Sequence, residues 1–505
     1  MPNGKAWLVG AGPGDPGLIT VRGLEVLTRA EVVLFDALAH PSLLDACPSA
    51  LKENVGKRYG VESPSQEAIN QKIIEHARAG KRVVRLKGGD PFLFARGSEE
   101  ASALAAAGIP FEIVPGIPSA VGASAYAGLS LTHRDWSSSV TIITGSDKAG
   151  KEWSPDAWKK LATATDTICV LMGMRRIEDI TRAIIDGGRP ASTPALVVQW
   201  GTRPEQRVVE GVLGDIAERV RAAKLSNPAV IFVGEVVNLR QSLRWFDNRP
   251  LFGKRILVPR APHQAEATAR AIRERAAEPV VFPVIEIHEP PDPERLRRAA
   301  REVASYDWVV FTSANGVDRF MTTLRTEGKD ARAFGGARVA VIGPKTKSAL
   351  AAYGIEADLM ADEYVGEAVA EALLARGPVQ RVLIPRALVA RDALPARLQS
   401  AGASVDVVAA YETRAVPRER GEALREMLAG GGVDVALFTS GSTVTSLLDL
   451  LGADAADALA QVTVASIGPI TTRVLEERGI RPRVTAERYT VAGLLDALEL
   501  ALGGN

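Results

Sequence analysis

The sequence predicts an α/β protein throughout, and two features of the chain support this fold class. Short apolar runs rich in Val, Ile and Leu alternate with longer amphipathic stretches along its length. This alternation is typical of mainly parallel sheets with helices packed on their faces. Three short motifs of the second half also occur twice, which indicates two similar lobes there.

The first half carries two blocks of these alternating segments. In the first block, strand-like runs lie within residues 6–12, 31–37 and 81–89, with helix-like stretches at 20–30 and 66–80. The second block has strand-like runs within four further segments, 138–145, 166–173, 194–201 and 227–237. We expect each block to form one α/β lobe.

A break in the pattern marks the boundary between the two halves. After Val237 the alternation stops, and Pro250 and Gly253 interrupt any helix before a new strand begins at Arg255. We therefore expect a first domain at 1–246 with lobes at about 1–134 and 137–246, a linker at 247–253, and a second domain at 254–505.

The second half contains an internal repeat of about 126 residues. The repeated motifs are a strand ending in Pro-Arg (from Arg255 and Arg381), Phe-Thr-Ser (from Phe311 and Phe438) and Ile-Gly-Pro-x-Thr (from Ile342 and Ile467). We expect one lobe of about 254–286 plus 413–505 and a second of about 289–410. Open α/β sheets bind ligands at the carboxyl ends of their strands, so the cleft between these lobes is the expected site.

Composition narrows the class of protein. Lys and Arg number 61 against 60 Asp and Glu, so a net charge of +1 gives no reason to expect nucleic-acid binding. No run of 18 apolar residues occurs and the first residues lack the pattern of a signal peptide, so we expect no membrane partner and a cytoplasmic location. The five histidines and two cysteines form no metal-ligand pattern, so no metal is expected.

The first strand runs into a glycine turn from Gly10 to Asp15. The turn differs from the dinucleotide motif G-x-G-x-x-G because its sixth position is Asp15. Pro13 has no N–H for a phosphate, and the Asp15 carboxylate would repel one. The turn is therefore either purely structural or one that an uncharged or cationic ligand approaches.

Further motifs follow this turn in a characteristic order. They are Asp36, Val55-Gly-Lys57, Arg85-Leu-Lys-Gly-Gly-Asp-Pro-Phe-Leu-Phe94, Ala95-Arg-Gly-Ser-Glu-Glu100, Val114-Pro-Gly-Ile-Pro-Ser119, Leu131-Thr-His-Arg-Asp135, Leu171-Met-Gly173 and Trp200-Gly-Thr202. With them, residues 4–246 resemble the tetrapyrrole methylases, and more narrowly the uroporphyrinogen-III C-methyltransferases. Through the repeated motifs and Tyr411-Glu-Thr413, residues 253–505 resemble the uroporphyrinogen-III synthases.

The resemblance implies two consecutive steps of tetrapyrrole biosynthesis, on a route to siroheme, cobalamin or heme. The synthase half would cyclise hydroxymethylbilane to uroporphyrinogen III, with loss of water, inversion of ring D and no cofactor. The methylase half would methylate this product at C2 and C7 to precorrin-2, turning two S-adenosylmethionine molecules into S-adenosylhomocysteine. The implied fold is a two-lobed methylase followed by a synthase with two flavodoxin-like lobes, and a homodimer through the methylase half.

The resemblance also assigns contacts to S-adenosylmethionine. By position these are Pro13, Gly88, Gly89, Asp90, Leu93, Pro118, Ser119, Met172, Gly201 and Ala229. Glycines at such positions let the backbone approach a ligand closely. Core packing is the alternative interpretation of Met172.

For methyl transfer, the resemblance gives Asp36 as proton acceptor and Lys57 as proton donor, although both residues could instead be ordinary exposed charges. Arg96, Glu99 and Arg134 match positions that face the tetrapyrrole. Because the substrate carries eight carboxylates and the chain has almost no net charge, we expect local clusters to bind it, namely Arg85, Lys87, Arg96 and Arg134.

The chain departs from the family pattern at Ala37, Ala95 and Ser146, where the family often has Arg, Gly and His. The charged members of the motifs are retained. We interpret the changes as altered substrate packing with retained activity, and reduced methylation efficiency stays open.

For the synthase half, the resemblance gives Tyr411 as the group that assists departure of the substrate hydroxyl. Hydroxyl donors are expected at Thr312, Ser313, Thr346, Ser440 and Thr471, whose alternative role is the capping of helices. Arg260 and Arg386 are candidate carboxylate contacts. The alternatives for the whole protein are a methylase of a later corrin precursor and a two-lobed tetrapyrrole-sensing binding protein.

Overall fold

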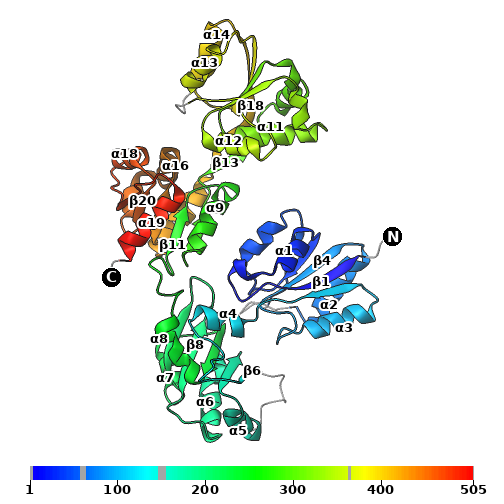
Figure 1. The fold of residues 1–505 in the computed structure, drawn as a ribbon, viewed down its shortest axis with the longest axis vertical. Coiled ribbons are helices and arrows are strands. Elements are labelled where there is room, and N and C mark those ends of the chain that lie inside the picture. The colour runs from blue at the N-terminus through cyan, green and yellow to red at the C-terminus, as the bar shows by residue number, and fades with distance from the viewer. Residues whose placement is uncertain (1–3, 57–63, 146–154, 362–365, 504–505) are drawn as a thin grey trace. The chain divides into compact units, whose positions relative to one another are not determined.

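The computed structural model describes residues 4–56, 64–145, 155–361 and 366–503 of the protein (Figure 1). In this part of the chain, the strands form four sheets, and helices connect most of the strands. The chain divides into two compact units, of which the first is mainly residues 1–256 and the second mainly 257–494. The predicted α/β class is confirmed, and the exact domain and lobe boundaries stay a prediction.

The first sheet is parallel, with strand order β3-β2-β4-β1-β5. Its strands are β1 (Lys5–Gly10), β2 (Val32–Phe35), β3 (Leu51–Asn54), β4 (Arg82–Lys87) and β5 (Phe111–Val114). Helices α2 (Gln66–Arg78) and α3 (Gly97–Ala106) cover one face of this sheet, and α1 (Val21–Thr28) covers the other (Figure 1). Apolar side chains of these helices pack against those of the strands on each face. Strands covered on both faces are normally apolar, so the buried charges of β4 need a separate explanation.

The second sheet is mixed, with strand order β6-β7-β10-β8-β9. Its strands are β6 (Val140–Thr144), β7 (Thr167–Leu171), β8 (Pro194–Gln199), β9 (Arg207–Val212) and β10 (Ala229–Val233). Only β6 and β7 pair in parallel. The mainly parallel arrangement therefore does not extend to this sheet. The short connection from β8 to β9 accounts for the antiparallel pairing of these two strands, and β10 runs antiparallel to both of its neighbours.

Helix α4 (Ser119–Tyr126) follows the last strand of the first sheet and packs on the second sheet. Its alanines contact apolar side chains of β7, β8 and β10. The remaining helices of this unit are α5 (Pro155–Ala164), α6 (Ile177–Asp186), α7 (Ile216–Ala222) and α8 (Arg240–Leu243). Because α4 is anchored to one sheet and joined to the other, its residues can connect ligand-binding turns from both.

The third sheet has strand order β12-β11-β19-β20-β21. Its strands are β11 (Arg255–Val258), β12 (Glu278–Val281), β19 (Val435–Phe438), β20 (Thr463–Ser466) and β21 (Val484–Thr485). Its helices are α9 (Pro262–Arg273), α15 (Arg418–Ala429), α16 (Gly441–Leu451), α17 (Ala455–Leu459), α18 (Pro469–Glu477) and α19 (Val491–Leu502).

The fourth sheet has strand order β13-β18-β17-β14-β15-β16, with only β13 antiparallel to its neighbour. Its strands are β13 (Ile285–His288), β14 (Trp308–Phe311), β15 (Arg338–Val341), β16 (Leu359–Met360), β17 (Arg381–Ala387) and β18 (Ser404–Ala415). Its helices are α10 (Pro293–Arg301), α11 (Ala314–Thr326), α12 (Pro344–Ala351), α13 (Gly366–Leu374) and α14 (Ala393–Ser400).

The internal repeat occupies equivalent places in the third and fourth sheets. The Pro-Arg motif forms β11 in one sheet and β17 in the other, Phe-Thr-Ser ends β19 and β14, and Ile-Gly-Pro-x-Thr follows β20 and β15. Each sheet therefore combines motif copies from both repeats. The chain crosses from one sheet to the other after its first motif and returns for its last two.

Candidate active sites

Three glycine turns of the first sheet pack backbone against backbone. Gly12 and Gly89 exchange two main-chain hydrogen bonds, of 3.2 and 2.8 Å. A Cβ atom on Gly10 would lie 2.5 Å from the Cα of Gly116, so no side chain fits there. The predicted residues Gly88, Gly89 and Asp90 thus belong to one compact cluster of backbone groups.

The carboxylates of these turns support the turns themselves. Asp90 accepts hydrogen bonds from the N–H groups of Gly116 (2.9 Å) and Phe92 (2.8 Å). Asp15 accepts from the N–H of Gly17 (2.7 Å) and from the hydroxyl of Tyr126 (2.7 Å). Both side chains therefore orient the loop backbone that a ligand would approach.

Helix α4 joins the predicted cofactor residues of the two sheets. Pro118, which precedes the helix, and Ser119, its first residue, lie next to Gly89, and a Cβ on Gly122 would meet the Pro13 ring at 2.4 Å. The next residue, Ala123, is so close to Gly201 that a Cβ added to Gly201 would lie 2.5 Å from the Cβ of Ala123. The sequence therefore identified turns that the fold brings to one helix.

Met172 and Ala229 lie at the edge of the second sheet that Gly201 occupies. Val230 pairs with Leu171, and Ala229 pairs with Gln199, so the residues that follow these partners lie at one end of the sheet. Met172 has a positive φ of 57° and is 47% exposed. Core packing, the alternative interpretation of Met172, is therefore wrong. Leu93 is half-buried in the loop before α3.

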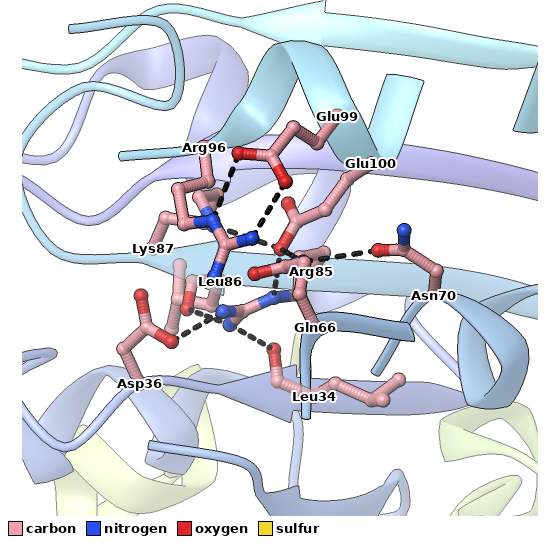
Figure 2. Close-up of polar contacts among 10 residues, drawn as sticks. All are labelled: Leu34, Asp36, Gln66, Asn70, Arg85, Leu86, Lys87, Arg96, Glu99 and Glu100. Atoms are coloured by element: carbon pink, nitrogen blue, oxygen red, sulfur yellow. Dashed lines mark hydrogen bonds and ion pairs between the residues drawn. The ribbon is translucent and has the colours of Figure 1, made fainter. Parts of the chain in front are cut away.

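Next to these turns lies a buried charge cluster of Asp36, Arg85, Lys87 and Glu100 (Figure 2). Glu100 of α3 is fully buried, and one of its oxygens, Oε1, accepts from Arg85 (3.1 Å) and Lys87 (2.9 Å). The guanidinium of Arg85 also donates to the carboxylate of Asp36, which follows β2. Burial, followed by the charge of Arg85, lowers the pKa of Lys87.

This cluster corrects one sequence-based expectation. Arg85 and Lys87 were expected to bind substrate carboxylates, but they are only 3% and 2% exposed and pair with acidic residues of the protein. The two residues alternate with Val84 and Leu86 along β4, so they face α2 and α3 in the interior. Their role is therefore internal.

The remaining predicted methylase residues differ in their surroundings. Arg96 binds Glu99 through two hydrogen bonds, of 2.8 and 2.6 Å, and both side chains are 50% exposed. Arg134 is exposed in the segment before β6. Arg96 is the residue just before α3 and has a positive φ of 60°. Lys57 and Ser146 lie outside the described residues, whereas Ala37 and Ala95 lie in loops after β2 and before α3.

In the second unit, the structure brings Tyr411 and Ser313 together. Their hydroxyl oxygens are 3.1 Å apart, although the residues are 98 positions apart in the sequence. Tyr411 lies on β18 and is 7% exposed, and Ser313 follows β14. Ser313 also caps α11 by accepting from the N–H of Gly316 (3.1 Å). The two interpretations of Ser313, capping and hydroxyl chemistry, are therefore compatible.

The other predicted hydroxyls are placed at equivalent helix starts. Ser440 caps α16 by accepting from Thr443, and Thr312 is half-buried beside Ser313. Thr346 and Thr471 are the third residues of α12 and α18 and are 3% and 4% exposed. These two side chains therefore face the protein interior.

The two repeated arginines also differ. Arg386 is 7% exposed and donates to Asp392 (2.5 Å) and to the carbonyl of Arg391 (2.6 Å). Arg260 is half-buried, and burial lowers its pKa. Of the two, Arg386 is already neutralised by the loop that follows β17.

A cavity of about 570 Å³ in this unit is lined by residues that sequence reasoning did not select. They include Asn315, Asp318, Arg319 and Thr322 of α11, with Arg420 of α15 and residues of β13. The signal that could have found them is the spacing of the α11 residues, because positions i, i+3, i+4 and i+7 share one face of a helix. This polar stripe begins at Asn315, two residues after the Phe-Thr-Ser motif.

Each unit thus carries a candidate site at strand ends of α/β sheets, so the fold and these residues define the class of α/β proteins with one candidate site in each of two units. In the described part of the chain, no group of three or more His, Cys, Asp or Glu side chains could hold a metal ion. No helix within the described residues is long and apolar enough to cross a membrane.

Comparisons with known proteins match this division. The family of tetrapyrrole (corrin/porphyrin) methylases matches residues 5–217, and uroporphyrinogen-III synthase HemD matches residues 266–496. The porphyrin biosynthesis protein HemD of Ruminiclostridium josui is 36% identical over 100% of this chain and 99% of its own length. The uroporphyrinogen-III C-methyltransferase of Bacillus subtilis (strain 168) is 38% identical over 66% of this chain and 68% of its own.

Among solved structures, the uroporphyrin-III C-methyl transferase from Thermus thermophilus, complexed with S-adenyl homocysteine, is 37% identical. It covers 47% of this chain and 100% of its own length with a TM-score of 0.41. The full-length relative and the two family matches show that the chain belongs to the tetrapyrrole-biosynthesis proteins that fuse a tetrapyrrole methylase to a uroporphyrinogen-III synthase. The resemblance inferred from the motifs is confirmed, and the protein is a bifunctional enzyme with methyltransferase and synthase activities.

Proposed function

We propose that the two halves catalyse consecutive reactions on the same tetrapyrrole. The synthase half converts hydroxymethylbilane to uroporphyrinogen III, with loss of water and inversion of ring D. The methylase half then methylates uroporphyrinogen III at C2 and C7 to give precorrin-2. The name of the Bacillus subtilis relative, a uroporphyrinogen-III C-methyltransferase, and the family match to uroporphyrinogen-III synthase support uroporphyrinogen III as the compound that the two halves share.

The observation that carries the methylase proposal is the convergence of glycine turns on α4. Backbone groups and small residues surround this point, and a Cβ on Gly89 would fill space 3.7 Å from Pro118. The carboxylate of Asp90 already accepts two backbone N–H groups, and Pro13 offers none to a phosphate. This donor set fits S-adenosylmethionine, an uncharged nucleoside joined to a sulfonium cation.

The residues proposed to hold S-adenosylmethionine are Pro13, Gly88, Gly89, Asp90, Leu93, Pro118, Ser119, Met172, Gly201 and Ala229. When bound, S-adenosylmethionine supplies an electrophilic methyl group that passes to a pyrrole carbon as S-adenosylhomocysteine leaves. Asp36 accepts the proton that the methylated ring must lose. Its carboxylate lies at a strand end and its side chain is 27% exposed, so a substrate can reach it. Lys57 is proposed as proton donor, and Arg96, Glu99 and Arg134 face the tetrapyrrole.

The synthase proposal depends on the hydroxyl pair of Tyr411 and Ser313. Tyr411 donates a proton to the departing substrate hydroxyl, which leaves as water, and Ser313 orients the phenol. Thr312 and Ser440 belong to the same proposal as hydroxyl donors at strand ends. Thr346 and Thr471 belong to it as buried hydroxyls in the first turns of α12 and α18. Neither the loss of water nor the ring closure requires a redox cofactor.

Two properties of the whole protein are part of the proposal. We expect a homodimer through the methylase half, as the resemblance implies. A cytoplasmic location is supported by Cys47 and Cys169, which are both buried free thiols, as is usual in a reducing compartment.

A coupled assay tests both halves. The full chain is supplied with hydroxymethylbilane and S-adenosylmethionine, and precorrin-2 is followed by absorbance. Asp36→Ala is expected to lower the methylation rate by about 100-fold or more and to leave cyclisation unchanged. Arg82→Gln, on the exposed end of β4, is the matched control with unchanged rates.

The identity of the accepted tetrapyrrole decides between the proposal and a methylase of a later precursor. Transfer of two methyl groups to uroporphyrinogen III is the expected result. Exclusive methylation of a cobalt-containing precursor would overturn the methylase assignment, and unchanged hydroxymethylbilane would overturn the synthase assignment.

A further inference from the structure

Glu100 collects charged and polar donors in a place from which water is excluded. It lies on α3 with 0% exposure, and its Oε1 accepts from Arg85 (3.1 Å), Lys87 (2.9 Å) and Gln66 (3.2 Å). Its second oxygen, Oε2, is buried and has no hydrogen-bond partner among the described residues. All of these hydrogen bonds therefore fall on one oxygen, so the Glu100 carboxylate holds Arg85, Lys87 and Gln66 on one side.

The guanidinium of Arg85 is fixed on three sides (Figure 2). Its Nε donates to Glu100, and its Nη1 donates to the carbonyl groups of Leu86 (3.1 Å) and Leu34 (3.4 Å). Its Nη2 donates to Oδ1 of Asp36. Because the guanidinium is planar and its donors form a rigid fork, these contacts hold it in one orientation.

The contact between Arg85 and Asp36 joins the interior to the candidate active site. Arg85 has 3% of its side chain exposed, and Asp36 has 27%. The backbone N–H of Asp36 donates to the carbonyl of Leu86 (3.1 Å), so the main chain of Asp36 is fixed to β4 as well. The Asp36 carboxylate is therefore oriented from behind and open toward a ligand.

Stability alone does not account for this arrangement. Buried ion pairs can often be replaced by apolar residues without loss of stability, because their desolvation offsets much of their attraction. Here two cations and two carboxylates balance, yet only one member of the cluster reaches the surface. In this arrangement the fixed guanidinium of Arg85 donates to Asp36, the carboxylate that reaches the surface.

We propose that Arg85, held in place by Glu100, is a positioning residue that orients the Asp36 carboxylate toward the proton it accepts after methyl transfer. The inference rests on the proposed role of Asp36 as proton acceptor. Arg85 does not touch the substrate and acts only through Asp36. Its removal therefore lowers kcat, whereas it leaves the affinity for S-adenosylmethionine unchanged.

A double-mutant cycle on the full chain tests this proposal. Arg85→Gln and Asp36→Asn are made singly and together, and methylation of uroporphyrinogen III is measured as kcat and KM. Each single variant is expected to lose about 100-fold in kcat. The double variant is expected to lose no more than Asp36→Asn, because Arg85 has no other route to the reaction. Multiplied losses would overturn the inference.

Binding and fold are measured separately from turnover. Calorimetric titration with S-adenosylmethionine is expected to give the same Kd for the wild type, Arg85→Gln and the exposed control Arg82→Gln. A loss of this affinity in Arg85→Gln would overturn the inference, because it would show that the cluster maintains the fold of the site. An unchanged kcat in Asp36→Asn would instead overturn the proposed role of Asp36 itself.

A second variant covers failure of Arg85→Gln to fold. Arg85→Lys keeps the positive charge beside Glu100, but a single ammonium lacks the fork that reaches Glu100 and Asp36 together. It is expected to bind S-adenosylmethionine normally and to show the same loss of kcat. Full activity of Arg85→Lys would overturn the inference, since charge without orientation would then suffice.

Discussion

The candidate site of the first unit is organised around buried charges, whereas that of the second unit is organised around hydroxyl groups. Asp36 is held by Arg85, which in turn depends on Glu100 from another element. Tyr411 is held by Ser313, whose hydroxyl is fixed locally as the cap of its own helix. The first arrangement requires three elements to be correctly packed, and the second requires one strand beside one helix start.

The difference follows from the kind of group that each reaction needs at its site. A carboxylate that accepts a proton must be charged, and a buried charge needs partners in place. A hydroxyl donor is neutral, so ordinary helix capping is sufficient to orient it. We therefore expect the first unit to be more sensitive to loss of a single partner than the second.

The largest expected effect is the loss of Glu100. Glu100→Ala leaves Arg85 and Lys87 buried without their shared carboxylate, so we expect a loss of about 3–5 kcal/mol in the stability of the first unit. Glu99→Ala, next to it but 50% exposed, is expected to change stability by about 0–1 kcal/mol. Calorimetric unfolding of both variants gives the comparison, and equal effects would contradict a special role for buried charge.

The next effect concerns pH. Burial, and then the charge of Arg203, lower the pKa of His40 to about 4, against an ordinary value of 6.5. The unfolded chain therefore binds this proton more readily than the folded one. The contribution of neutral His40 to the free energy of unfolding is fully present above pH 6.5. As the pH falls from 6.5 toward 4, about 3 kcal/mol of this free energy is lost.

His40→Asn tests this pH dependence with a residue that also caps a helix well. His40 accepts from the N–H of Ser42 (3.2 Å), and asparagine can replace that contact. Unfolding temperatures at pH 7 and pH 4.5 are expected to differ less in the variant than in the wild type. An equal difference would show that other groups cause the acid sensitivity of this unit.

In the second unit, Tyr411→Phe is expected to slow cyclisation of hydroxymethylbilane by about 100-fold and to leave methylation of added uroporphyrinogen III unchanged. Tyr306→Phe is the matched control, because the Tyr306 hydroxyl donates to Asp406 (2.7 Å) in the same sheet. A fall in both activities of a folded Tyr411→Phe protein would contradict two separate sites.

The smallest effects separate the two equivalent helix caps. Ser313→Ala and Ser440→Ala each remove a cap and are expected to cost about 1 kcal/mol of stability. The Ser313 hydroxyl lies within hydrogen-bond distance of Tyr411, whereas the Ser440 hydroxyl is paired with Ser442. Ser313→Ala is therefore expected to slow cyclisation more than Ser440→Ala. Equal cyclisation rates in the two variants would show that Ser313 does not orient Tyr411.

Local motifs predicted the α/β class, and they selected turns that the fold brings together. Gly89, Pro118 and Gly201 were selected from short patterns, and α4 brings their turns together because each needs a close backbone approach. The motif Arg-Leu-Lys in β4 was misinterpreted as substrate-binding. Alternation along a strand shows that Arg85 and Lys87 share one face of the sheet. It does not show that Glu100 of a helix covers that face.

The antiparallel pairing in the second sheet was not predicted for a similar reason. The strand-like runs of β8 and β10 are apolar in either direction, so their composition carries no information on pairing. Likewise, the cavity residues Asn315 and Arg319 lie on one helix face that becomes a lining only after the chain folds.

The sequence by itself determined the family, the division into two halves and the turns that need glycine or proline, since these depend on residues close together along the chain. Tertiary structure alone decided which charges are buried and which partners they meet. Glu100 lies 15 residues from Arg85, and Ser313 lies 98 from Tyr411. The energy of a charge or a hydroxyl depends on burial and on neighbours, and packing of distant elements fixes both.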